Sequence, residues 1–176
     1  MKRVILITGG ERSGKSSYSE TLALSMSNNP VYIATAHIWD EEFKERVRLH
    51  QQRRGPQWTN IEEETQLSNC KIENRCAVVD CITLWLTNII QPLLKNDTFD
   101  VNQALEIAKK ELDSFLNQDA TFIIVTNEIG SGGVSSNPMQ RRFTDLQGWV
   151  NQFIAERADE VILMVSGIAV KIKEKK

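Results

Sequence analysis

The residues best suited to chemistry are eight consecutive positions near the amino terminus, Gly9-Gly10-Glu11-Arg12-Ser13-Gly14-Lys15-Ser16. They match the pattern GxxxxGK[ST], whose glycines let successive backbone N–H groups turn inward around a polyphosphate. In such a loop the lysine reaches the β and γ phosphates and the last hydroxyl ligates Mg²⁺. We therefore predict nucleotide binding by all eight residues, with Lys15 also catalytic and Ser16 a metal ligand. The loop does not indicate which base is bound, or whether the nucleotide is cleaved, transferred or sensed.

Two carboxylates follow hydrophobic runs further along the chain. Asp80 ends the run Ala77-Val78-Val79 and is a candidate second ligand for Mg²⁺. Glu128 ends a run that begins at residue 122, and it could assist the metal or act as a base on an acceptor hydroxyl. Each could also be an ordinary acidic residue at the end of a strand.

The chain has two histidines, His37 and His50. His50 shares one face of an expected helix with Phe43 and Val47, and a lone histidine on an apolar face is usually a packed core residue. Three arginines, Arg46, Arg53 and Arg54, lie within about one helical turn of it. A phosphate held there would meet positive charge beside an imidazole able to attack phosphorus, so His50 is a candidate nucleophile.

Hydrophobic runs and helical periodicity predict the elements that must position these residues. Strands are expected at 3–8, 31–35, 76–81, 121–126, 161–165 and 169–173, and helices at 15–26, 40–52, 83–94, 102–116 and 138–157. The alternation predicts an α/β fold of the P-loop NTPase class, with a RecA-like, mostly parallel sheet flanked by helices. The last two strands are close in sequence and should pair as an antiparallel edge. Ligands of such sheets bind at the carboxyl ends of the strands.

Composition limits the function classes. A chain of 176 residues has room for one domain, and we expect residues 1–176 to form a single nucleotide-binding domain. The net charge of −2 argues against long nucleic acid as a partner. No apolar stretch approaches the roughly 20 residues of a membrane span. The three cysteines lack paired CxxC spacing, so we expect no disulfide framework or zinc site and a cytoplasmic location.

Further motifs follow the glycine loop in order. They lie at residues 32–36, 40–43, 46, 50, 54, 58–62, 80–88, 126–130, 142–145 and 158–161. With this set, over residues 5–173, the chain resembles the bifunctional adenosylcobinamide kinase/adenosylcobinamide-phosphate guanylyltransferases of cobalamin biosynthesis. The resemblance implies two reactions. ATP or GTP phosphorylates adenosylcobinamide, and GTP then guanylylates a histidine whose GMP passes to that phosphate, giving adenosylcobinamide-GDP.

The resemblance also implies roles for particular residues. His50 matches the guanylylated histidine of the family. Nucleotide contacts beyond the loop would be Ala34, Thr35, Ala36, Gln51, Gln52, Arg53, Arg54, Glu62 and Asp80. The family further implies Mg²⁺ and a homotrimer. Two positions depart from its pattern: Ser135 and Ser136 stand where many relatives have a proline and an acidic residue, and Glu11 replaces a small residue.

Two other functions fit parts of the sequence. A simple small-molecule kinase would use the loop, Asp80 and Glu128, with His50 structural, and would carry no label from GTP marked in its α phosphate. A RecA-like regulatory module would bind a partner in a nucleotide-dependent way and transfer nothing to a small acceptor.

Overall fold

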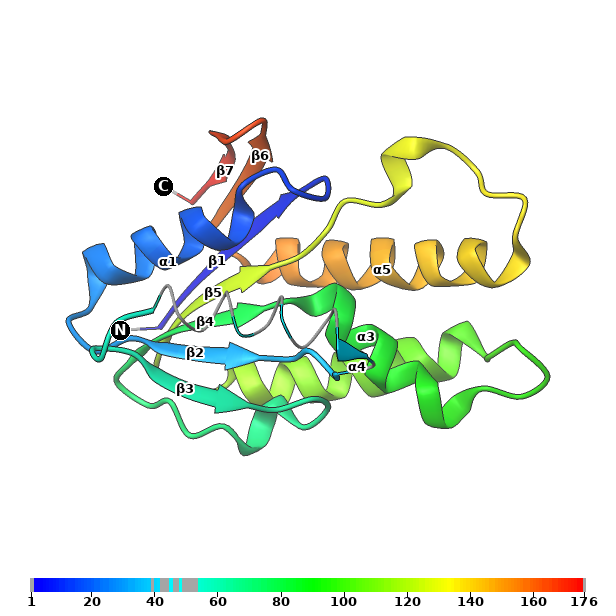
Figure 1. The fold of residues 1–176 in the computed structure, drawn as a ribbon, viewed down its shortest axis with the longest axis horizontal. Helices are drawn as coiled ribbons and strands as arrows, with labels where there is room; N and C mark the ends of the chain where they lie inside the picture. Colours follow the sequence, from blue (N-terminus) through cyan, green and yellow to red (C-terminus); the bar gives the residue numbers. More distant parts are fainter. Residues whose placement is uncertain (1, 39, 42–44, 46–47, 49–53, 176) are drawn as a thin grey trace.

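The computed structural model describes residues 2–38, 40–41, 45, 48 and 54–175, and it is built around one seven-stranded sheet (Figure 1). The strand order is β3-β2-β4-β5-β1-β6-β7. The strands are β1 (Arg3–Gly9), β2 (Val31–Ala34), β3 (Thr59–Glu62), β4 (Cys76–Asp80), β5 (Thr121–Val125), β6 (Glu160–Val165) and β7 (Ile168–Glu174). All neighbours pair in parallel except β6 and β7, which are antiparallel. The predicted mostly parallel sheet with an antiparallel edge is confirmed.

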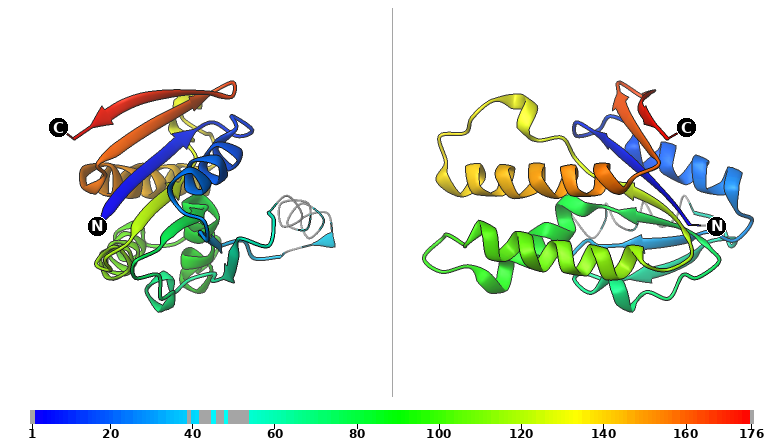
Figure 2. Two further views of the ribbon diagram at one scale, coloured as in Figure 1. Left: turned by 90° about the vertical axis from the view of Figure 1, so that its left-hand side faces the viewer. Right: turned by 180° about the vertical axis from the view of Figure 1, so that it is seen from behind.

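Helices cover both faces of this sheet, which explains why its central strands are continuous apolar runs. The helices are α1 (Lys15–Met26), α3 (Ile82–Ile90), α4 (Val101–Leu116) and α5 (Pro138–Arg157). Figure 2 shows α1 on one face and α4 and α5 on the other. The larger apolar core lies between the sheet and α3, α4 and α5, and a smaller core lies under α1. Among the described residues, no helix combines the length and apolar character needed to cross a membrane.

Helix α5 begins and ends where the sequence predicted. The Asn137 side chain accepts hydrogen bonds from the backbone N–H groups of Met139 and Gln140, and Pro138 occupies the first turn. An asparagine cap followed by proline is a strong local signal for a helix start, because both satisfy the geometry of the unpaired first turn.

The structure differs from the prediction in two places. Strand β3 was not predicted, because three of its four residues are polar and exposed and it contains no apolar run. The helix expected at 83–94 ends at Ile90, and a short 3₁₀ turn, Gln91–Leu93, follows it because Pro92 cannot continue the helical hydrogen bonding. Most of the helix expected at 40–52 lies outside the described residues.

The strand order places β5 between β1 and β4. The carboxyl ends of these strands therefore lie along one side of the sheet, which we call the carboxyl edge. It carries the glycine loop after β1, Glu128 after β5 and Asp80 at the end of β4. Register extends this row, since Asp80 pairs with Ala34 on β2, which pairs with Glu62 on β3. Five segments that are distant in the sequence thus meet at this end of the sheet.

Candidate active site

The glycine loop joins β1 to α1 in a conformation that depends on two glycines. Gly9 has a φ of 149°, and a Cβ added there would lie 2.5 Å from the backbone oxygen of Met164 on β6. Gly14, with a φ of 96°, is the N-cap residue of α1. Both backbone conformations are ones that residues with side chains rarely adopt. The loop is further held by a hydrogen bond of 3.0 Å from the N–H of Gly167 to the carbonyl oxygen of Ser13.

The Lys15 side chain curls back inside this loop. It is 7% exposed, and its Nζ donates to the carbonyl oxygen of Gly10 at 2.6 Å, with Ser13 Oγ at 3.5 Å. Burial lowers the pKa of Lys15, while the nearby Cys81, Asp80 and Glu11 act in the opposite direction. The predicted phosphate-binding lysine therefore lies within electrostatic reach of the predicted metal-binding carboxylate.

Asp80 is held from the side by a tyrosine. The Tyr32 hydroxyl donates to Asp80 Oδ2 at 2.8 Å. Burial, followed by the charge of Asp80, raises the pKa of Tyr32 well above its usual range. The hydroxyl consequently stays protonated, and able to donate, throughout the neutral range.

The ends of β2 and β4 are joined just beyond Asp80. The buried Thr35 hydroxyl donates to the carbonyl oxygen of Cys81 at 2.8 Å and accepts from its N–H at 2.9 Å. Asn88 on α3 donates to the carbonyl oxygen of Thr35 at 2.8 Å. The Asp80–Cys81 peptide bond is cis. Burial raises the pKa of Cys81 to about 12, so this thiol is neutral and is not a nucleophile near pH 7.

Glu128 lies beside the start of the glycine loop. Its N–H donates to the carbonyl oxygen of Gly9 at 3.0 Å, and its exposed carboxylate accepts from the N–H of Gly130 at 3.0 Å. A base on an acceptor hydroxyl needs this kind of exposed carboxylate near the phosphates.

A buried polar cluster on α5 supports the strand end before Glu128. Gln147 Nε2 donates to the Thr126 hydroxyl at 2.8 Å, and that hydroxyl donates to Asn151 Oδ1 at 2.7 Å. Asn151 Nδ2 in turn donates to the carbonyl oxygen of Asn127 at 3.1 Å. Sequence reasoning missed this cluster. The available signal was two amides at i and i+4 among the apolar positions of the helix, where polar residues require partners.

A cavity of ≈490 Å³ opens beside this edge, between the ends of β2 and β3. It is lined by Ala34, Ala36, His37, Ile38, Glu62, Glu63 and Glu64. Three of the predicted nucleotide-contacting residues, Ala34, Ala36 and Glu62, are thus together. At its wall His37 Nδ1 lies 2.9 Å from a Glu64 carboxylate oxygen. The cavity is mostly walled by small apolar and acidic side chains.

Arg54 is buried rather than open to solvent. Its guanidinium carbon lies 3.6 Å from the centre of the Tyr32 ring, and its side chain is 2% exposed. Its Nε donates to Asn60 Oδ1 at 2.8 Å, and Nη1 lies 3.5 Å from Glu20 Oε1. Contact with a nucleotide stays a prediction for Arg54. His50, Gln51, Gln52 and Arg53 lie outside the described residues.

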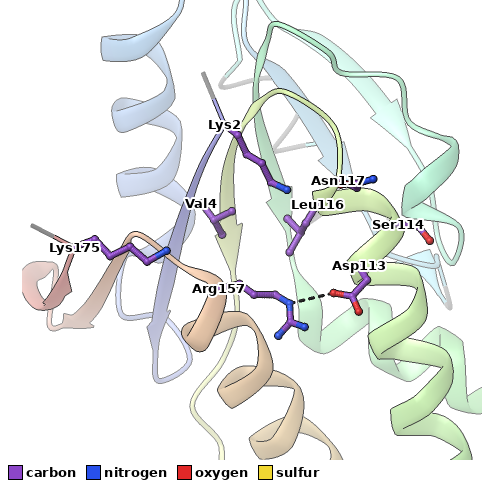
Figure 3. Close-up of a pocket in the computed structure, with 8 residues that line it drawn as sticks. All are labelled: Lys2, Val4, Asp113, Ser114, Leu116, Asn117, Arg157 and Lys175. Atoms are coloured by element: carbon purple, nitrogen blue, oxygen red, sulfur yellow. Dashed lines mark hydrogen bonds and ion pairs between the residues drawn. The ribbon is translucent and has the colours of Figure 1, made fainter.

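A larger cavity, ≈660 Å³, lies at the opposite edge of the sheet (Figure 3). Figure 3 shows Lys2, Val4 and Leu116 around it, with Arg157 bonded to Asp113 at 3.0 Å. Arg157 also stacks on the Phe153 ring and donates to the Phe153 carbonyl oxygen, so it stabilises the carboxyl end of α5. This cavity is at the amino ends of the strands and away from the glycine loop.

The donor atoms predicted for Mg²⁺ are a hydroxyl on Ser16 and a carboxylate on Asp80, which are hard oxygen ligands of the type this ion prefers. Within the part of the chain that the structure describes, no group of three or more His, Cys, Asp or Glu side chains is gathered to hold a metal. Two protein ligands suffice for Mg²⁺ in a nucleotide site, because phosphates and water supply the rest. The residues present therefore fit a nucleotide-bound Mg²⁺ rather than a separate metal cage.

Taken together, the strand order, the glycine loop at the carboxyl edge and the carboxylates beside it define a P-loop nucleotide-binding enzyme of the RecA-like class. The fold agrees with a solved ATPase of the type III secretion system of pathogenic bacteria. That structure has a TM-score of 0.53 and 12% identity, and the match covers 97% of this chain and 57% of the other.

Sequence comparison defines the family. The family model of cobinamide kinase / cobinamide phosphate guanyltransferase matches residues 5–172. The bifunctional adenosylcobalamin biosynthesis protein CobP of Pseudomonas aeruginosa is 39% identical, over 96% of both chains. The corresponding CobU of Escherichia coli K12 is 36% identical, over 97% of this chain and 99% of the other. The chain therefore belongs to the cobinamide kinase / cobinamide phosphate guanyltransferase family.

Proposed function

We propose that this protein phosphorylates adenosylcobinamide with ATP or GTP and then transfers GMP from GTP to the product through a guanylyl-histidine. The observation that carries the proposal is the single edge at which the glycine loop, Asp80, Glu128 and the cavity beside Ala34 and Glu62 meet. A nucleotide and an acceptor oxygen brought to this edge would meet every group that phosphoryl transfer requires.

In the first reaction an acceptor hydroxyl oxygen attacks the γ phosphorus, and the nucleoside diphosphate leaves. The loop N–H groups and Lys15 bind the phosphates and stabilise charge on the leaving oxygen. Glu128 accepts the hydroxyl proton, because its carboxylate is exposed beside the loop. Mg²⁺, held by Ser16 and Asp80, would supply charge neutralisation between the phosphates.

In the second reaction the His50 imidazole nitrogen forms a bond to the α phosphorus of GTP, and the bond from that phosphorus to the β-phosphate oxygen breaks. Pyrophosphate leaves. A phosphate oxygen of adenosylcobinamide phosphate then attacks the same phosphorus, the N–P bond breaks, and the diphosphate link forms. The covalent intermediate divides one difficult transfer into two easier ones.

Four other features belong to this proposal. The nucleotide contacts would come from the eight loop residues and from Ala34, Thr35, Ala36, Gln51, Gln52, Arg53, Arg54, Glu62 and Asp80. The whole chain would act as one catalytic domain. The protein would be cytoplasmic and would assemble as a homotrimer.

The test supplies adenosylcobinamide, ATP, GTP and Mg²⁺ and follows the corrin products by chromatography. The wild-type protein should form the phosphate first and then the GDP derivative, and Lys15→Ala should slow both steps by at least about a hundredfold, because each uses the same phosphate site. A protein that stops at the phosphate is a simple kinase. A protein that forms neither product is a nucleotide-binding module, and the proposal fails.

A further inference from the structure

Tyr32 reaches the site by a hydrogen bond to Asp80, and the two proposed reactions give it no role. It is the residue before Ile33 in β2, it is 4% exposed, and its hydroxyl donates to Asp80 Oδ2 at 2.8 Å. Positions 32 and 80 are 48 apart in the sequence, and β2 and β4 are neighbours in the sheet. The bond therefore crosses from one strand to the next at the edge where the nucleotide is expected.

Two side chains pack against the tyrosine ring. Arg54 packs on its face, with the guanidinium carbon 3.6 Å from the ring centre, and Trp58 meets it edge-on at 6.0 Å between centres. A buried cation over an aromatic face and an aromatic pair each stabilise a single ring position. Arg54 is itself held by Asn60 at 2.8 Å and lies 3.5 Å from Glu20 on α1. These contacts restrict the ring, so the hydroxyl is held in position to donate to Asp80.

The hydrogen-bond partner of the Tyr32 hydroxyl is not the one that a tyrosine packed in a core would need. A buried hydroxyl needs one partner, and a backbone carbonyl would serve. Here the partner is the half-buried carboxylate at the strand end. The hydroxyl donates to Oδ2, one of the two carboxylate oxygens, so the other oxygen can turn toward a ligand.

We infer that Tyr32 is a positioning residue for Asp80: its hydroxyl orients the carboxylate toward the metal bound with the nucleotide, and Arg54 and Trp58 hold the ring that carries it. This inference rests on the proposed role of Asp80. Besides the nucleotide contact proposed for Arg54, it gives this side chain a role inside the protein, in support of the tyrosine.

The test measures how much Mg²⁺ strengthens nucleotide binding. The probe is the α,β-methylene analogue of GTP, which cannot lose pyrophosphate, and its Kd is measured by calorimetry in EDTA and in Mg²⁺. Tyr32→Phe keeps the ring under Arg54 and removes only the hydroxyl. We expect its Kd in EDTA to match that of the wild type. The gain from Mg²⁺, defined as the Kd in EDTA divided by the Kd in Mg²⁺, should fall about tenfold, which is the usual loss when a hydrogen bond to a metal ligand is removed.

Tyr18 provides a matched control, because it is the other of the two tyrosines and lies on α1 in the same small core. Tyr18→Phe should keep the full Mg²⁺ gain. The second control is Asp80→Asn, alone and combined with Tyr32→Phe. If the tyrosine acts through Asp80, the hydroxyl deletion should have no further effect on the gain in that background.

Three results would overturn the inference. The first is Tyr32→Phe protein with an undiminished Mg²⁺ gain, and the second is a loss of equal size with Asp80 already replaced. The third is a wild-type protein whose affinity does not respond to Mg²⁺, which would also remove the proposed role of Asp80. Thermal unfolding of each variant checks that it folds.

Discussion

Lys15, Asp80 and Cys81 show how burial decides which polar side chains can react. Lys15 keeps its ammonium group against the loop carbonyl, and Asp80 remains half-buried at the strand end. Cys81, adjacent to Asp80, has a buried thiol, and burial raises its pKa to about 12. Cys81 is therefore not suited to be the nucleophile of the proposed guanylyl transfer, a role that the proposal gives to His50.

The cysteines give a prediction at the residue scale. Burial raises the pKa of Cys70 and Cys76 to about 11 and that of Cys81 to about 12, against 9.0 for an ordinary thiol. An aromatic disulfide reagent at pH 8 should leave all three unmodified in the native protein and titrate all three in denaturant.

The same shifts predict a pH dependence. Above pH 9 the unfolded chain loses thiol protons that the folded protein keeps, so the unfolded state binds fewer protons. The thiol contribution to the free energy of unfolding should therefore fall as pH rises from about 9 toward 12. Replacing Cys81 with alanine should make the free energy of unfolding, measured with urea, fall less steeply between about pH 9 and 12. An unchanged slope would contradict the raised pKa of Cys81.

At the scale of elements, the site depends on how closely β6 approaches the glycine loop. A Cβ at Gly9 would meet the Met164 oxygen at 2.5 Å, a contact with backbone that cannot be relieved by turning a side chain. Gly148 on α5 has no atom within 4 Å of the same added carbon and no positive φ. Substitution by alanine should therefore destabilise the protein at Gly9 and stabilise it at Gly148.

Gly9→Ala should lower the melting temperature and weaken nucleotide binding at least tenfold, because either the loop or β6 must move. Gly148→Ala should raise the free energy of unfolding by about 0.5 to 1 kcal/mol, since alanine favours a helix over glycine. Calorimetry and thermal unfolding of both variants check the pair. Tight nucleotide binding by Gly9→Ala would show that the close approach of β6 is unimportant.

The elements also show what local sequence can and cannot predict. Helix α5 follows from Asn137 and Pro138, and β1, β4 and β5 follow from apolar runs, because these signals are local. Strand β3 was missed because its polar residues join the sheet only through pairing with β2. The Tyr32–Asp80 bond and the Gln147 cluster were missed for a related reason: they join segments that meet only in the folded chain.

At the scale of the whole molecule, β7 is an exposed edge with apolar side chains. Ile168 and Ile172 are 67% and 59% exposed, and with Val170 they alternate along one face of the strand. The strand also carries Lys171, Lys173 and Glu174, but the face formed by the three apolar side chains is exposed, and exposed apolar edge strands promote association. The proposed homotrimer offers a surface that would cover β7.

Ile168→Lys with Ile172→Lys should therefore shift sedimentation from a trimer toward a monomer, while Ile107→Lys, on the exposed side of α4, should not. Analytical ultracentrifugation at several concentrations makes the comparison. A double variant that sediments as the wild type does would place any subunit contact elsewhere.

GMP is proposed to become bonded to His50 during turnover, and intact-protein mass spectrometry tests this step most directly. The protein is incubated with GTP and Mg²⁺ without acceptor, and the modified peptide is then mapped. We predict one GMP adduct on His50, labile to acid and stable to base, which disappears when adenosylcobinamide phosphate is added and is absent in His50→Ala but present in His37→Ala. A wild-type protein that forms the GDP derivative with no adduct on His50 would contradict the account.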